Sequence, residues 1–249
     1  MNEDNVSPGG PSFPIGGLTP ARHDLLDYAT ERVAYEEPRL VESELARTPL
    51  EQFERWYADA RNVAIAEPNA MVLATTDPQG APSARTVLLK EADARGFVFF
   101  TNYTSRKAGQ VEATHRVALV FPWHPIARQV IVLGRAERVG TEETSAYFAT
   151  RPWGSRIGAW ASRQSAELAD RAELEQRWAE LAERWPDRGL PDDVPLPDHW
   201  GGYLVRPVEV EFWQGRPSRL HDRLVFLPVL DGAPALDDAS AWRVIRRQP

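Results

Sequence analysis

The stretch MVLATTDPQGAPSARTVLLKEADARGFVFFTN, residues 71–102, decides the expected fold. It contains short runs rich in Val, Leu and Phe, separated by turn residues such as Asp77-Pro78-Gln79-Gly80. Runs of this length between such turns are typical of β-strands. Similar runs follow further along the chain, so the pattern predicts an antiparallel sheet or barrel. The predicted strands are 71–76, 83–90, 96–102, 117–123 and 128–139.

Helices are predicted on either side of these strands. Pro49 opens one whose apolar residues Leu50, Phe53, Trp56 and Ala60 recur every three to four positions. Two shorter helices each begin at a hydroxyl residue suited to an N-cap, and a longer one has an apolar stripe assigned to core or subunit contact. These helices are 105–115, 141–151 and 166–185; a loop at 186–197 and strands at 202–213, 223–229 and 242–246 follow.

Composition excludes several classes of protein. No apolar run approaches the roughly 18 residues that span a bilayer, and residues 1–20 lack a signal pattern, so we expect a cytoplasmic protein. The absence of cysteine excludes disulfides and thiolate chemistry, and no metal site is predicted. A net charge of −7 argues against a nucleic-acid surface. Residues 1–20, rich in Gly and Pro, are expected to be a disordered tail.

Basic residues nevertheless occur in or beside apolar segments, where a cation usually needs an anionic partner. For any one of them an ordinary ion pair with a carboxylate of this chain is the favoured interpretation. A bound anionic ligand is the alternative. The residues are Arg85, Lys90, Arg106, Lys107, Arg128, Arg151, Arg219 and Arg223.

Two segments combine such cations with groups that bind phosphate. Residues 85–90, RTVLLK, form a strand with a cation at each end, and alternation predicts that Arg85 and Lys90 lie on opposite faces and serve two anions, unless a bulge intervenes. Residues 101–107, TNYTSRK, run from a strand end into a helix start, where backbone N–H groups, hydroxyls and two cations would hold a phosphate. No glycine-rich nucleotide loop is present, so a Rossmann or P-loop site is not expected.

Two later segments carry candidate groups for catalysis and for a second phosphate. In RLHDR, residues 219–223, strand periodicity would place Arg219, His221 and Arg223 on one face; His221 alone is more often structural than catalytic. Tyr147 and Arg151 lie four residues apart on a predicted helix, and with Ser155 they could form a second phosphate clamp or simply a capped helix end.

Taken together, five ordered motifs resemble the pyridoxine/pyridoxamine 5'-phosphate oxidase family. The resemblance covers roughly residues 49–223, and the terminal segment 242–249 is also similar. The motifs are RTVLLK at 85–90, FFTNYTSRKA at 99–108, FPWHPIARQV at 121–130, RPWGSRIGAWASRQS at 151–165 and WGGY…EFWQG…RLHDR at 200–223.

The resemblance implies a mainly β protein with flanking helices (α+β), a single split β-barrel domain over residues 21–249. It also implies a homodimer with one FMN in each of two clefts between subunits. The residues that match the family's FMN-binding positions are Arg85, Thr86, Val87, Leu88, Lys90, Phe100, Thr101, Arg106, Lys107, Gln129, Gln164, Ser165, Trp213 and Arg223.

For the substrate, the resemblance implies that Lys90, Tyr147, Arg151 and Ser155 hold a phosphate, with Arg219 and His221 over the pyridine ring as catalytic residues. The implied reaction oxidises pyridoxamine or pyridoxine 5'-phosphate with O2 to pyridoxal 5'-phosphate and H2O2. Arg32 and Tyr35 match an arginine/tyrosine pair that closes over the substrate, although Val33 and Ala34 between them depart from the pattern.

Two other functions are compatible with parts of this pattern. A flavin oxidase of secondary metabolism, of the phenazine type, would lose the substrate-phosphate residues, all of which are present. A non-catalytic flavin- or heme-binding split-barrel protein would lose Arg219 or His221, and both are kept. The loop at 228–240 is longer than the family pattern implies and has no evident role.

Overall fold

The computed structural model describes residues 39–63 and 65–249, which belong to one compact unit. The predicted tail at 1–20, Arg32 and Tyr35 lie outside the described residues. Among the described helices, none is long and apolar enough to cross a bilayer.

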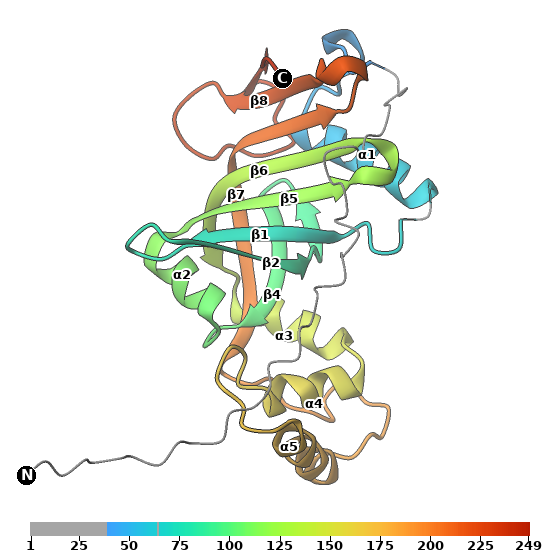
Figure 1. Ribbon diagram of the computed structural model, residues 1–249. Helices are drawn as coiled ribbons and strands as arrows, with labels where there is room; N and C mark the ends of the chain where they lie inside the picture. The colour runs from blue at the N-terminus through green and yellow to red at the C-terminus, as the bar shows by residue number, and fades with distance from the viewer. Residues whose placement is uncertain (1–38, 64) are drawn as a thin grey trace, which may run out of the picture. The chain divides into compact units, whose positions relative to one another are not determined.

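The described strands form one antiparallel sheet that curls into a half-barrel (Figure 1), as the resemblance implied. Its path runs β2-β1-β5-β6-β7-β4-β3, with β8 added to β7 and β9 to β8. The strands are β1 Ala70–Thr76, β2 Pro82–Leu88, β3 Glu91–Asp93, β4 Gly96–Asn102, β5 Arg116–Trp123, β6 Arg128–Arg138, β7 Trp200–Gln214, β8 Asp222–Pro228 and β9 Trp242–Arg246.

Strand β7 is the longest and connects two regions of the sheet. Its first half, from Trp200, pairs with β4, and its second half, ending at Gln214, pairs with β8. It also pairs with β6 along most of its length, except at Val208, which bulges out between the pairs Leu133–Glu209 and Gly134–Pro207. A proline, which cannot donate a ladder hydrogen bond, is tolerated beside such a bulge.

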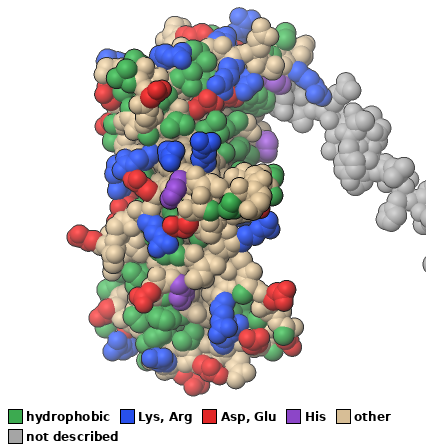
Figure 2. Space-filling model, turned by 90° about the vertical axis from the view of Figure 1, so that its left-hand side faces the viewer, with side chains coloured by type: hydrophobic (Ala, Val, Ile, Leu, Met, Phe, Trp, Pro, Cys, Tyr) green, Lys and Arg blue, Asp and Glu red, His purple; other side chains and the backbone are tan. Residues whose placement is uncertain are grey.

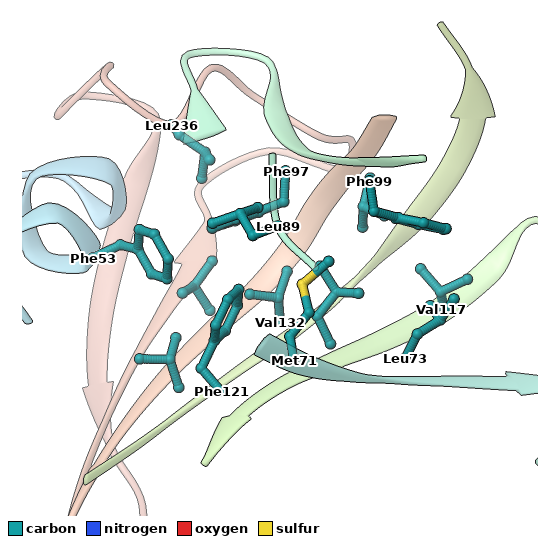
Figure 3. Packing of buried hydrophobic residues seen from close by; sticks show 14 of the residues in the cluster. Phe53, Met71, Leu73, Leu89, Phe97, Phe99, Val117, Phe121, Val132 and Leu236 are labelled. Atoms are coloured by element: carbon teal, nitrogen blue, oxygen red, sulfur yellow. The ribbon is translucent and has the colours of Figure 1, made fainter. Parts of the chain in front are cut away.

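Helix α1 (Pro49–Asn62) covers one end of the half-barrel and supplies the centre of the core. Thr48 caps it by accepting a hydrogen bond from the Glu51 amide. Phe53 packs edge-on against Phe97 and Phe121, each 5.0 Å away between ring centroids; Figure 3 shows these rings around the strands. The amphipathic stripe predicted for this helix is confirmed.

The long loop after β8 has a role in this core. Leu236 is fully buried and its backbone bonds to Ala94 and to Leu50 of α1, while the Trp242 indole donates to Ala235. Leu236 lies among the labelled core residues in Figure 3. The loop therefore contributes the buried Leu236 side chain to the core.

The other helices are α2 (Arg106–Thr114), α3 (Thr141–Thr150), α4 (Trp153–Ala161) and α5 (Arg171–Arg184). In Figure 1, α3, α4 and α5 gather at the end of the sheet opposite β8. Short 3-10 turns occur at Glu42–Glu44, His124–Ile126 and Pro217–Arg219. The predicted N-cap Ser105 is confirmed, but Thr141 lies inside α3, whose N-cap is Gly140.

Two details of the prediction are wrong. Helix α4 was not predicted, because Gly154 and Gly158 lower its helix propensity, although Trp153, Ile157 and Ala161 recur at four-residue spacing. Helix α5 begins at Arg171 and not at residue 166, because Asp170 caps it by accepting from the Ala172 amide. None of its side chains is buried in this chain, so the predicted role of its stripe in the core is not found, and the alternative, a subunit contact, stays a prediction. The helix packs on α4, with Trp178 edge-on to Trp153.

Candidate functional site

A cavity of about 700 Å³ lies between β2, β4, α3 and α4. Most of the predicted ligand-binding residues line it, and among the described residues no aspartate or glutamate does. We call the following residues the cavity group: Arg85, Thr86, Val87, Leu88, Lys90, Phe100, Thr101, Lys107, Tyr147, Arg151, Ser155 and Gln164.

Arg85 and Lys90 line the same cavity, so the predicted placement on opposite faces is wrong. Strand β2 ends at Leu88 because the chain there changes partner. The Leu89 amide donates to Asn69, whereas the Lys90 amide donates to Val98 of β4. The alternation that holds within one strand no longer applies across this crossing.

The cavity cations have no carboxylate partners within the described part of the chain. The expected ion pairs are found for Arg128, which contacts Asp59, and for Arg223, which contacts Glu211. They are not found for Arg85, Lys90, Lys107 and Arg151. On the face shown in Figure 2, by contrast, basic and acidic side chains are interspersed. The cavity is therefore suited to anions.

One pair of cations lies where β4 meets α2. The Arg85 guanidinium donates to Thr75 Oγ1 and Ser83 Oγ, both at 2.6 Å, and Lys107 Nζ donates to Gln164 Oε1 at 2.7 Å. Burial, together with the charge of Arg85, lowers the pKa of Lys107 to about 8. Two cations held close together by neutral partners are stabilised when a dianion binds between them.

Arg106 and Ser165 lie beside this pair but line an adjoining cavity of about 640 Å³, with Gln164 in both walls. The Arg106 amide, at the first position of α2, donates to Ser165 Oγ at 3.2 Å. The helix start predicted to hold a phosphate therefore borders this second cavity, with the Arg106 side chain exposed, and the phosphate site stays a prediction.

A second group of polar residues comes from α3, α4 and the end of β2. Lys90 Nζ is 6.0 Å from the centre of the Tyr147 ring, and the Arg151 guanidinium lies 4.6 Å above the Trp200 ring. Arg151 Nη1 is buried and has no hydrogen-bond partner in the described part of the chain. Burial is the main reason that the pKa of Arg151 is lowered.

The remaining predicted residues lie elsewhere in the sheet, and we call Gln129, Trp213, Arg219, His221 and Arg223 the strand-end group. Gln129, Trp213 and Arg223 are neighbours across β6, β7 and β8. The His221 ring contacts the Trp213 ring at 4.7 Å, and its Nδ1 accepts from the Arg216 amide. Nδ1 therefore carries no proton, and burial and the charge of Arg219 lower the pKa of His221.

The argument from strand periodicity is wrong for Arg219 and His221. Both precede β8, which begins at Asp222, and Arg219 is the last residue of a 3-10 turn, with a left-handed φ of 62°. His221 reaches Trp213 because the chain turns back sharply here. Arg223 does lie in the strand, where it pairs with the buried Glu211.

The two groups are far apart within one chain. Trp200, at the cavity, and Trp213, in the strand-end group, are thirteen residues apart on β7. At about 3.3 Å per residue, this is about 40 Å along the strand. One small ligand cannot contact both groups of the same chain.

Sequence reasoning missed Trp200 as a cavity residue, along with Asn102 and Ser162. The sequence signal for Trp200 is the motif WGGY, which is part of the resemblance but is assigned no role by it. The two glycines that follow it are required by close packing: a Cβ on Gly202 would lie 2.8 Å from the Phe100 ring, and one on Gly201 would lie 2.2 Å from the Tyr103 hydroxyl.

Comparisons with known proteins agree with the motifs. Residues 58–184 match the family model "Pyridoxamine 5'-phosphate oxidase", and residues 200–249 match "Pyridoxine 5'-phosphate oxidase C-terminal dimerisation region". The chain is 59% identical to a pyridoxine/pyridoxamine 5'-phosphate oxidase of Kineococcus radiotolerans, covering 90% of this chain and 99% of the relative. It is 52% identical to that of Thermobifida fusca, covering 91% and 100%.

Among solved structures, PhzG from Burkholderia lata, in complex with tetrahydrophenazine-1-carboxylic acid, aligns with a TM-score of 0.74 and 28% identity over 86% of this chain and 99% of that chain. An FMN-binding protein from Nostoc punctiforme shares the fold, with a TM-score of 0.60 and 17% identity over 79% and 97%. Matches to both family models and high identity over nearly the full length of curated relatives show that the chain belongs to the pyridoxine/pyridoxamine 5'-phosphate oxidase family.

Proposed function

We propose that this chain is an FMN-dependent oxidase that converts pyridoxamine 5'-phosphate and pyridoxine 5'-phosphate to pyridoxal 5'-phosphate with O2. One observation carries the proposal: a single cavity, with no carboxylate among its described lining residues, holds two separate groups of cations, Arg85 with Lys107 and Lys90 with Arg151. A cofactor and a substrate that each bear a phosphate need two such groups. The names of the curated relatives support the same activity.

The first group fits the FMN phosphate. Arg85 and Lys107 are partly desolvated cations that form no ion pair with any described carboxylate, and Thr101 and Gln164 add a hydroxyl and an amide beside Lys107. The backbone and side chains of 86–88 would border the flavin ring, together with Phe100. FMN bound here would supply a hydride acceptor that O2 reoxidises, which no side chain of this chain can provide.

The second group fits the substrate phosphate. Arg151 has a buried N–H group that no described residue accepts from, Lys90 is an exposed residue of the cavity wall, and Ser155 adds a hydroxyl from α4. Tyr147 stacks on Phe100 with 4.0 Å between ring centres, which fixes its hydroxyl at the end of α3. A phosphate held here would anchor the pyridine ring so that its reacting carbon faces the flavin.

A second copy of the chain completes the site in this proposal. Four members of the strand-end group, Trp213, Arg219, His221 and Arg223, lie within the segment that matches the family's dimerisation region. Gln129 shares one side of β6 with Ile131 and Leu133, and Leu133 and Val208 are exposed apolar residues beside an open hollow. Contact through this face would bury apolar surface and bring the partner's Trp213, His221 and Arg223 to the cavity.

Arg219 and His221 are then the candidate catalytic residues. Because Nδ1 of His221 accepts from a backbone amide, the Nε2 position of the neutral ring carries the proton. A lowered pKa keeps the ring neutral at pH 7, so it can orient the substrate without adding repulsion to Arg219. We assign His221 to holding the substrate's polar groups and Arg219 to covering the ring.

The test supplies pyridoxamine 5'-phosphate in air to the FMN-loaded protein and follows aldehyde and H2O2 together. The proposal expects equal amounts of both, and a loss of about 100-fold or more in the Arg219→Ala, His221→Ala double variant. An FMN-loaded protein that is inert toward both phosphorylated vitamers would overturn it. Turnover of an aromatic substrate that lacks a phosphate would instead favour the phenazine-type oxidase, a possibility kept open by the similarity to PhzG.

A further inference from the structure

The motif Trp200-Gly201-Gly202-Tyr203 opens β7 and has no part in the function proposed so far. Trp200 pairs with Asn102 of β4 and is 7% exposed, with its ring in the cavity wall. Gly202 leaves the space in which Phe100 lies, since a Cβ there would approach that ring to 2.8 Å. The motif therefore places two aromatic rings side by side under the cavity.

These rings support helix α3. The planes of Trp200, Phe100 and Tyr147 are nearly parallel, at 12° between Trp200 and Phe100 and 9° between Trp200 and Tyr147. Phe148 meets Trp200 edge-on at 5.0 Å. Tyr147 and Phe148 of α3, together with the C-cap residue Arg151, thus converge on one indole.

The contact with Arg151 is the informative one. A buried guanidinium is normally held by carboxylates or carbonyls, which occupy its N–H groups. In the described part of the chain Arg151 has no ion pair, and its buried Nη1 has no hydrogen-bond partner. The Trp200 face, 4.6 Å away, attracts the cation without using its in-plane donors. The donors are left available to a ligand.

We propose that Trp200 is a positioning residue for the substrate phosphate: its indole face holds the Arg151 guanidinium in place with its donors free. The inference rests on the proposed function, in which Arg151 binds that phosphate. An arginine fixed before binding loses less side-chain freedom when the phosphate arrives, so affinity rises. Trp200 touches neither phosphate nor flavin in this arrangement and acts through Arg151.

The test compares Trp200→Leu and Trp200→Phe with the parent protein, all loaded with FMN. Loss of the cation–π contact should raise KM for pyridoxamine 5'-phosphate about five- to tenfold while kcat stays within about twofold. Phenylalanine keeps an aromatic face and should recover most of the affinity. Titration with inorganic phosphate, followed by calorimetry, should show the same loss of affinity without any turnover.

Two controls separate positioning from general damage. Trp242→Leu removes an equally buried tryptophan, 6% exposed, on β9, and should lower the melting temperature without changing KM. In an Arg151→Ala background, Trp200→Leu should have no further effect on KM, because the residue through which it acts is gone.

Each result decides one question. An unchanged phosphate affinity in Trp200→Leu, or an equal rise in KM with and without Arg151, would refute the positioning role even if the parent enzyme is fully active. A parent protein that binds phosphate in a Trp200-dependent way, yet oxidises neither vitamer, would support the positioning role and refute the proposed function.

Discussion

If two chains build each site, then two inactive variants should restore activity when they share a dimer. The first variant, Arg151→Ala, removes from the cavity group a hydrogen-bond donor to the substrate phosphate. The second, His221→Ala, removes the imidazole ring from the strand-end group. Each alone should be impaired in both sites of its dimer. Loss of a charged hydrogen bond of about 1.5–3 kcal/mol lowers kcat/KM of the first by about 10- to 100-fold.

In a dimer of one chain of each kind, one site receives both substitutions and the other receives neither. Random mixing of equal amounts makes half of the dimers hybrid, so about one quarter of the sites are intact and about one quarter of the wild-type activity should return. Hybrids isolated through two different affinity tags should recover about half.

The assay is aldehyde formation from pyridoxamine 5'-phosphate by the co-expressed and tag-purified chains. Arg151→Ala paired with Lys90→Ala is the matched control. Both lesions lie in the cavity group, so every site keeps one of them and nothing is restored. If the Arg151→Ala and His221→Ala hybrid is no more active than its parents, each site is built by one chain and the two-chain argument from β7 fails.

Three further predictions concern charge and packing. The affinity for FMN, measured by flavin fluorescence, should fall by up to about tenfold per pH unit above pH 8, because Lys107 with its pKa of about 8 loses its charge there. Lys107→Arg should remove this dependence, and a slope that persists would refute the assignment. Leu236→Ala should lower the free energy of unfolding by about 2–4 kcal/mol in urea denaturation, whereas Leu230→Ala, in the same loop but 81% exposed, should change it by less than about 0.5 kcal/mol. Gly96→Ala should unfold at a much lower temperature than Gly80→Ala, since both have positive φ but only Gly96 places a Cβ 2.0 Å from the Val205 carbonyl oxygen; equal melting temperatures would contradict this.

Most of the strands were predictable because they are rich in apolar residues and bounded by turn residues, whereas β3, Glu91–Asp93, has no such pattern and was not predicted. The helix at Pro49 was equally clear, with proline at its first turn and a regular stripe. Helix α4 was missed because its sequence WGSRIGAWA holds two glycines, and its residues are fixed by contacts with α5 and with the loop before β7. The Trp160 indole, for example, donates to the Pro195 carbonyl. Such tertiary contacts leave no local pattern.

For the site, the motifs predicted many of the residues that line one cavity. They did not predict to which face of the sheet each side chain points. Arg85 and Lys90 were assigned to opposite faces because alternation assumes one continuous strand, whereas the chain changes partner after Leu88. His221 was placed by the same rule, although a 3-10 turn precedes it. The separation of the strand-end group from the cavity depends on how far β7 extends, which no motif reveals.

The length of β7 also limits how this chain can vary in evolution. Inserting one residue between Gly202 and Val208 would turn Trp200 to the opposite side of the sheet relative to Trp213. The two side chains could then not both keep their present orientations. Val208 differs, because it is already unpaired opposite β6. Its deletion would straighten the ladder, preserve both orientations and shorten the spacing by about one 3.3 Å step. Relatives that differ in substrate size could therefore accommodate length changes at this bulge.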